Sequence, residues 1–241
     1  MTMRFFITLS YDGTRYHGWQ IQPNADTVQQ RLQDALSTLL RQPIEVVGAG
    51  RTDTGVHAKM MMAHFTISQF DNIAYKLNKL LPPDIAVQEV RQVAEDLHAR
   101  FSATSRTYHY FIHTYKDPFV QAYSWQIPFK LDFEKMNEAA QVLLEYKDFT
   151  SFSKVNTDVK TNLCDIKEAY WQEVAPDQWR FTITANRFLR NMVRAIVGTL
   201  VEVGRGKMSL EDVRRIIEAK DRCQAGESVP AKALSLVSIK Y

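Results

Sequence analysis

Three side chains that could do chemistry stand close together in "VVGAGRTDTGVHA" (46–58): Arg51, Asp53 and His57. They follow a short apolar run and lie in a glycine-rich turn, and such junctions often display catalytic groups. A guanidinium within about 4–6 Å of a carboxyl group lowers its pKa and keeps it ionised at neutral pH. Asp53 beside Arg51 is therefore suited to nucleophilic or electrostatic catalysis by a single carboxylate.

Other interpretations of this turn fit less well. Asp53-Thr54-Gly55 spells the aspartic protease triplet, but that chemistry needs two carboxylates that share a proton, and Arg51 favours full ionisation. Gly48 and Gly50 begin a dinucleotide-binding pattern, but Asp53 takes the place of its third glycine and would repel a pyrophosphate. An ordinary turn aspartate is the remaining alternative.

The elements that would position these groups can be predicted from periodicity. Thr27 and Gln30 begin a helix with one apolar stripe, and alternating or β-branched runs predict strands. In the first part of the chain we expect strands at 4–11, 44–50, 60–68 and 85–93 and a helix at 28–40.

The second part follows a similar pattern. We expect a strand at 106–115, a helix capped by Asp132, a hairpin from 164–174 and 178–186, a helix at 187–203 and another from Ser209. Hairpins without a regular βαβ period predict an α+β fold with a largely antiparallel mixed sheet and helices packed on one face. We predict two related subdomains, 1–103 with the aspartate and 104–241 with the basic helix.

Composition narrows the function classes. The chain has 241 residues, 45% of them hydrophobic, and a net charge of +3, so a polyanionic partner would have to meet a local patch. Cys164 and Cys223 have no metal-site spacing, and no run is long enough to span a membrane. The N-terminal apolar run is too short for a signal peptide, so we expect a cytoplasmic protein without a metal.

The longer string "GAGRTDTGVHA" resembles the catalytic motif of the TruA family of tRNA pseudouridine synthases. Further segments resemble this family in order along nearly the whole chain. They are "YDGTRYHGWQIQ" (11–22), "TVQQRLQDAL" (27–36), "LPPDIAV" (81–87), "HARFSATSRTYHY" (98–110), "FLRNMVRAIVGTLVEVG" (188–204) and "VPAKALSLVSIKY" (229–241).

The resemblance implies an enzyme that isomerises uridine to pseudouridine at positions 38, 39 and 40 of the tRNA anticodon stem-loop, in a pseudouridine synthase fold. It implies that Asp53 is the essential aspartate, that Tyr108 packs against the target base, that Arg51 contacts the flipped-out base and that Arg194 pairs with the aspartate. It also implies a homodimer without metal or organic cofactor. Asp53 could attack C1′, add to C6 or abstract the 2′ proton, and the sequence leaves these routes open.

The segment around Arg194 also suggests an RNA contact. On a helix, Arg187, Arg190 and Arg194 would share one face and could follow phosphates, with Gly198 allowing close approach, although a solvated polar face is the alternative. The family often has histidines where this chain has Arg190-Asn191. It usually has glycine near Ala233, so we expect a backbone there that tolerates a Cβ.

Three further expectations complete the analysis. His57 is expected to make a supporting hydrogen bond or to be packed, and His17 with Gly18-Trp19 to shape the edge of a cleft. Tyr108 and Tyr110 alternate on one strand face, where core packing is the usual fate of aromatic pairs. A catalytically silent tRNA-binding protein of the same fold stays open as an alternative.

Overall fold

The computed structural model describes residues 2–68, 71–154 and 160–241, and it divides into two compact units. The first unit comprises Met1–Thr104 with Ser235–Tyr241, and the second comprises Ser105–Leu234. The sequence-based prediction places the whole of 104–241 in the second subdomain. The last strand belongs instead to the first unit, because Ser235 and Leu236 pair with His57 and Ala58.

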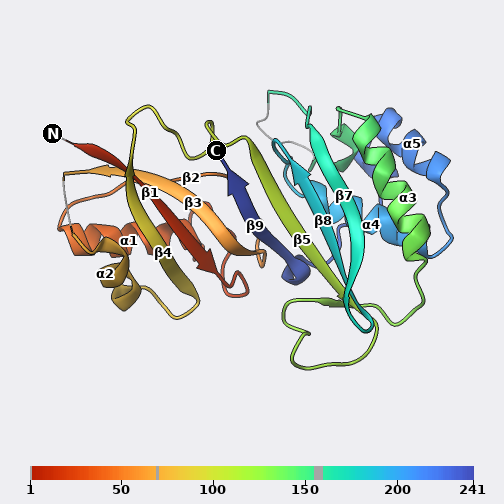
Figure 1. Cartoon of the computed structure of the whole chain (residues 1–241), viewed down its shortest axis with the longest axis horizontal. Helices are drawn as coiled ribbons and strands as arrows, with labels where there is room; N and C mark the ends of the chain where they lie inside the picture. Colours follow the sequence, from red (N-terminus) through yellow and green to blue (C-terminus); the bar gives the residue numbers. More distant parts are fainter. Residues whose placement is uncertain (1, 69–70, 155–159) are drawn as a thin grey trace. The chain divides into compact units, whose positions relative to one another are not determined.

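The first unit contains five strands and two helices among its described residues. In Figure 1 they are β1 (Met3–Tyr11), α1 (Val28–Leu40), β2 (Val47–Gly48), β3 (His57–Ile67), α2 (Ile73–Leu80), β4 (Ile85–Val93) and β9 (Leu234–Lys240). The strand order is β4-β1-β3-β9, with β2 paired to β3. β1 is antiparallel to both of its neighbours, and β9 runs parallel to β3.

Helix α1 has the predicted bounds, for the predicted reason. The Thr27 side chain accepts a hydrogen bond from the Gln30 backbone N–H at 3.4 Å, which satisfies one of the donors that every helix start leaves unpaired. The Gln30 side chain does not complete a capping box with Thr27, because its amide donates to Asp34 at 2.7 Å. The stripe of Val28, Leu32, Ala35 and Leu36 is buried, as its spacing required.

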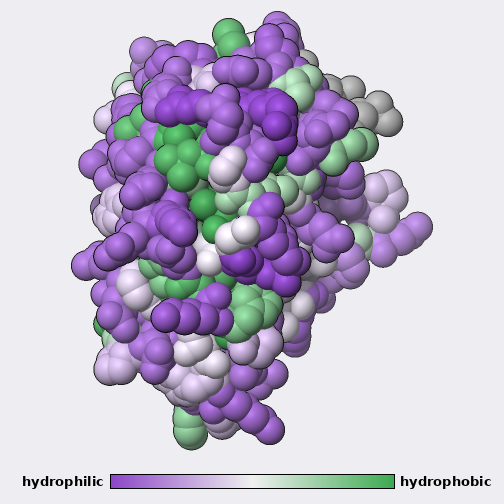
Figure 2. Space-filling model, turned by 90° about the vertical axis from the view of Figure 1, so that its right-hand side faces the viewer, coloured by the Kyte–Doolittle hydropathy of each residue, from purple (hydrophilic) through white to green (hydrophobic). Residues whose placement is uncertain are grey.

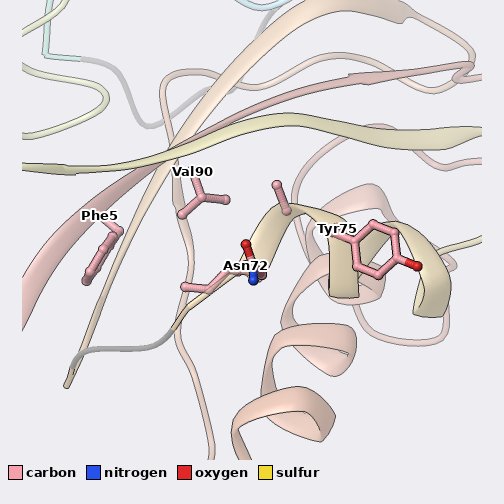
Figure 3. Close-up of a pocket in the computed structure, with 6 residues that line it drawn as sticks. Phe5, Asn72, Tyr75 and Val90 are labelled. Atoms are coloured by element: carbon pink, nitrogen blue, oxygen red, sulfur yellow. The ribbon is translucent and has the colours of Figure 1, made fainter.

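Helix α2 was not predicted. It has eight residues and its N-cap, Asn72, has a left-handed backbone without a side-chain cap, so the usual start signals are missing. It is held to β4 by Asn78, whose amide donates to the Val87 carbonyl and accepts from the Val87 N–H, both at 2.7 Å. Figure 3 shows a pocket beside its first turn, lined in part by Phe5, Asn72, Tyr75 and Val90. None of the predicted site residues lines this pocket.

The opposite face of these strands is covered by the turn-rich segment that follows β4 and by the C-terminal residue. Phe6 of β1 lies edge-on to the Tyr241 ring, and His64 of β3 accepts a hydrogen bond from the Ala99 N–H at 3.1 Å. The Tyr241 hydroxyl donates to the Ala99 carbonyl at 2.8 Å. The C-terminal residue and the "HARFSA" segment thus close one core together. Burial, and then the charges of His98 and Arg4, lower the pKa of His64 to about 4.

The second unit contains four strands and three α-helices among its described residues. They are β5 (Ser105–His113), β6 (Trp125–Gln126), α3 (Phe133–Val142), β7 (Ile166–Ala175), β8 (Gln178–Ala185), α4 (Met192–Gly204) and α5 (Leu210–Ala219). β5, β8 and β7 form an antiparallel series, and β7 with β8 is the predicted hairpin. Asp132 caps α3, and Ser209 with Asp212 forms a complete capping box at α5.

Helix α3 packs on the β7–β8 hairpin. The Phe133 ring stacks on Trp179 with centroids 3.7 Å apart, and Asn137 exchanges two hydrogen bonds with the Trp171 backbone. Figure 2 views the side on which α3 and α5 lie, and hydrophilic residues cover most of it between smaller apolar patches. This agrees with amphipathic helices, which bury an apolar stripe and expose a polar face.

Helix α4 corrects one prediction. It begins at Met192, not at residue 187, because Asn191 has φ +68°, a left-handed backbone that cannot continue an α-helix. Nearly every residue of α4 is buried, so it lacks the broad polar face that we expected. Gly198 does approach a backbone closely, but that backbone is the chain's own: a Cβ there would lie 1.9 Å from the Glu227 carbonyl oxygen.

The predicted fold class is confirmed: helices and a mostly antiparallel set of strands. Ala233 is buried and is not among the described residues with positive φ, which confirms that its backbone tolerates a Cβ. In the described part of the chain, no helix is both long and apolar enough to cross a membrane.

Candidate active site

Asp53 lies half-buried on the loop that joins β2 to β3. The loop ends in a tight turn in which the Val56 N–H donates to the Asp53 carbonyl at 3.1 Å and Gly55 takes φ +76°. The chain then enters strand β3 at His57. A nucleotide-cradling loop has to lead into a helix N-terminus, so that interpretation of the glycines is wrong.

The segment "YDGTRYHGWQIQ" (11–22), called the opening motif below, contacts this loop on both sides of Asp53. Before the aspartate, the Trp19 N–H donates to the Thr52 carbonyl at 3.3 Å, and the Thr52 hydroxyl shares a 2.8 Å hydrogen bond with the Tyr11 phenol. After it, the Gly55 N–H donates to the Tyr16 carbonyl at 3.3 Å. Residues 11–19 therefore support the aspartate loop directly. This role goes beyond the cleft edge that we expect His17, Gly18 and Trp19 to shape.

Glycines make this approach possible. A Cβ on Gly18, which has φ +87°, would lie 2.3 Å from the Thr52 carbonyl oxygen, and one on Gly13 would lie 2.1 Å from that of Val56. Gly48 faces the Trp19 indole, where a Cβ would lie 2.3 Å from Nε1. A Cβ on Gly50 would meet nothing within 4 Å. Gly50 therefore leaves open space beside the loop, whereas the other three glycines allow residues 11–19 to pack closely against residues 48–56.

His57 is buried and supports the same loop. Its Nδ1 accepts a hydrogen bond from the Gly13 N–H at 3.0 Å and also lies 3.1 Å from a carboxylate oxygen of Asp12. An ion pair with Asp12 would need a proton on Nδ1, whereas a hydrogen bond from the Gly13 N–H needs the lone pair of Nδ1. The N–H is fixed in place and Asp12 already accepts from Thr14, so we assign Nδ1 as the acceptor of the Gly13 N–H.

Asp84 anchors the opening motif from a third segment, "LPPDIAV". Its carboxylate accepts from the Tyr16 phenol at 2.7 Å and from the Arg15 Nε at 2.7 Å, and its carbonyl accepts from the Asp12 N–H at 2.9 Å. Burial, and then the bond to Asp84, raise the pKa of the Tyr16 phenol. Sequence reasoning did not predict this role, although the resemblance had singled out the segment.

In the second unit, Tyr108 and Tyr110 have different environments. Tyr110 is fully buried, and its hydroxyl donates to the Pro230 carbonyl at 3.1 Å. Tyr108 is half-buried at the middle of β5, opposite Ile183, with its ring perpendicular to that of Phe188 at 5.2 Å. Core packing therefore describes Tyr110 and not Tyr108.

The arginines do not form a helical row. Arg194 stands in the first turn of α4, where its Nε donates to the Val229 carbonyl at 2.7 Å. Arg187 and Arg190 precede the helix, half-buried and exposed respectively, and the Arg190 carbonyl accepts from the Lys154 N–H. The prediction that they share one helical face is wrong, because the break at Asn191 ends the helical spacing. Their contact with RNA stays a prediction.

The predicted site residues divide between the two units. Arg51, which is exposed, shares its loop with Asp53 in the first unit. Tyr108, Arg187, Arg190 and Arg194 belong to the second. The pairing of Arg194 with Asp53 stays a prediction. Among the described residues, no group of three or more His, Cys, Asp or Glu side chains could hold a metal ion.

The fold and the site define an α+β protein that presents Asp53 on a loop supported by residues 11–19. The model of the tRNA pseudouridine synthase family matches residues 7–102 and 139–241, and the chain belongs to this family.

Relatives support this along the full length. tRNA pseudouridine synthase A of Bacteroides thetaiotaomicron is 58% identical, covering 99% of this chain and 90% of that protein. The proteins of the same name from Porphyromonas gingivalis and Bacillus subtilis are 57% and 42% identical, each over 99% of this chain and 97% and 99% of theirs. Among solved structures, Thermus thermophilus Cse3 bound to an RNA gives a TM-score of 0.23 at 11% identity, over 82% of this chain and 90% of that one, a score too low to indicate a shared fold.

Proposed function

We propose that this enzyme isomerises uridine to pseudouridine in tRNA, at positions 38, 39 and 40 of the anticodon stem-loop, with Asp53 as the essential carboxylate. The observation that carries the proposal is the family match along the chain together with an aspartate whose loop is held by residues 11–19, which Asp84 anchors in turn. We place the reaction in the cytoplasm.

The chemistry suits a single carboxylate. The bond from C1′ to N1 breaks and a bond from C1′ to C5 forms, while C5 loses a proton and N1 gains one. The atoms balance within the nucleotide and nothing is oxidised or reduced, so we expect neither metal nor organic cofactor. The target base has to leave the stack at a cost of a few kcal/mol, of which stacking on an aromatic ring recovers about 1–3 kcal/mol.

Each predicted residue receives a role on this basis. Asp53 attacks C1′, adds to C6 or takes the 2′ proton, and Arg194 stabilises its charge. Tyr108 stacks on the flipped base, and its phenol is our candidate for removing the C5 proton. Arg51, Arg187 and Arg190 contact the RNA.

Release of tritium from tRNA labelled at uracil C5 tests the proposal. The wild type should release tritium, and Asp53→Ala and Asp53→Asn should not. Asp53→Asn keeps the size of the side chain and one hydrogen-bond acceptor. Loss of tritium release by this variant would therefore assign the effect to the negative charge of the carboxylate. A wild type that binds tRNA and releases nothing would support the catalytically silent alternative, and release by both variants would refute the role of Asp53.

Tyr108 can be tested with a matched pair. Tyr108→Phe keeps the ring and loses the phenol, whereas Tyr108→Leu loses both. If the phenol takes the C5 proton, Tyr108→Phe should bind tRNA like the wild type and release tritium far more slowly. Equal release by Tyr108→Phe and the wild type would leave only the stacking role.

Site choice and assembly need separate measurements. Transcripts with cytidine at position 38, 39 or 40 should each lose the label from that position alone. Sedimentation should show the homodimer that the family resemblance implies. Peptide cleavage, which the aspartic protease alternative requires, should not be observed.

A further inference from the structure

The structure assigns a positioning role to Asp84: through Tyr16, its carboxylate fixes the loop that carries Asp53. This inference rests on the proposed function, since it concerns the same aspartate. It adds a residue from the "LPPDIAV" segment that makes no contact of its own with the Asp53 loop among the interactions described above.

The first step is the link from Asp84 to Tyr16. The Tyr16 phenol donates to Asp84 Oδ1 at 2.7 Å, and its side chain is 2% exposed. The Asp84 carboxylate is also largely shielded, with 15% of its side chain exposed, whereas its other partner, Arg15, is 66% exposed. A hydrogen bond to a charged acceptor is about twice as strong as one between neutral groups. The Tyr16 bond is therefore the part of this cluster that can hold a position.

The second step is the link from Tyr16 to the loop. The Tyr16 carbonyl accepts from the Gly55 N–H at 3.3 Å, two residues after the aspartate. Gly55 has a left-handed backbone and forms the turn that closes onto the Asp53 carbonyl. One residue thus binds Asp84 with its side chain and the catalytic turn with its backbone. A shift of Tyr16 has to move the turn.

The third step is that the other supports of the loop come from the same segment. Tyr11 and Trp19 hold Thr52, and Gly13 holds His57. The Asp84 carbonyl fixes this segment a second time, through the Asp12 N–H at 2.9 Å. That backbone bond survives any side-chain change at Asp84, so loss of the carboxylate should loosen the geometry of the loop without unfolding the unit.

The test uses the full chain with tRNA and three variants. Tyr16→Phe removes only the phenol bond, Asp84→Ala removes the carboxylate, and Asp84→Asn keeps an oxygen that can accept from Tyr16. Glu89→Ala is the matched control, because it removes another acidic–arginine pair of the first unit, with Arg91 at 3.8 Å on β4. Each variant is measured for tRNA affinity, melting temperature and single-turnover tritium release at saturating enzyme.

Tyr16→Phe and Asp84→Ala should slow the single turnover by about 10- to 100-fold, because a misplacement of about 1 Å can cost 100-fold, while tRNA affinity stays near that of the wild type. Asp84→Asn should recover most of the rate, and Glu89→Ala should match the wild type. Rates within twofold of the wild type, parallel losses of affinity and rate, or an Asp84→Asn as slow as Asp84→Ala would each overturn the inference. An inactive wild type would instead refute the proposed function, so the two failures can be told apart.

Discussion

Replacing Gly18 by alanine tests whether the opening motif sets the position of the catalytic loop. Gly18 has φ +87°, and a Cβ there would lie 2.3 Å from the Thr52 carbonyl oxygen, where ordinary contact begins at 3.4 Å. The loop would have to move by about 1 Å at the residue before Asp53, and a displacement of that size can lower a rate by about 100-fold. A left-handed alanine also costs about 1–2 kcal/mol of stability.

Gly206→Ala separates these two effects. Gly206 also has positive φ, +70°, but a Cβ there would meet nothing within 4 Å. Gly206→Ala should lose about 1–2 kcal/mol in urea unfolding, and Gly18→Ala should lose more, because its Cβ also meets the Thr52 carbonyl oxygen. Only Gly18→Ala should lose about 100-fold in single-turnover tritium release. If the two variants have equal turnover rates, the loop does not depend on close contact with Gly18.

Further predictions concern stability and RNA binding. The pKa of His64 is about 4 in the folded protein and near 6.5 in the unfolded chain, so the unfolded chain takes up a proton first as the pH falls. The free energy of unfolding should therefore be highest above pH 6.5 and should fall by about 3 kcal/mol as the pH drops to 4. His64→Asn, which can still accept from the backbone N–H, should flatten this dependence in urea titrations, and an unchanged profile would assign the effect elsewhere. Gly198→Ala should destabilise the protein by about 1–3 kcal/mol, because its Cβ would lie 1.9 Å from the Glu227 oxygen, and an unchanged melting temperature would contradict that contact. Arg190→Ala should reduce the slope of log affinity against log salt by about 0.7–0.9 if it binds one phosphate, and an unchanged slope would remove Arg190 from the interface.

Much of the fold could be predicted because its signals are local. The capping threonine and apolar stripe of α1, the alternation of β4 and the Ser209 capping box depend on neighbours within a few residues. The failures occurred where a local pattern competed with backbone geometry. Arginines at helical spacing predicted a helix from residue 187, but left-handed Asn191 starts it at Met192.

The sequence by itself determined the family and the aspartate beside an arginine, because residue types and short spacings suffice for these. Only the tertiary structure decided what the glycines admit and what holds the aspartate loop. Tyr16, Asp84 and Gly55 are far apart in the chain, and their hydrogen bonds exist only after β1, β3 and β4 have paired. Long-range contacts of this kind leave no periodic trace in the sequence, and the fold alone brings them together.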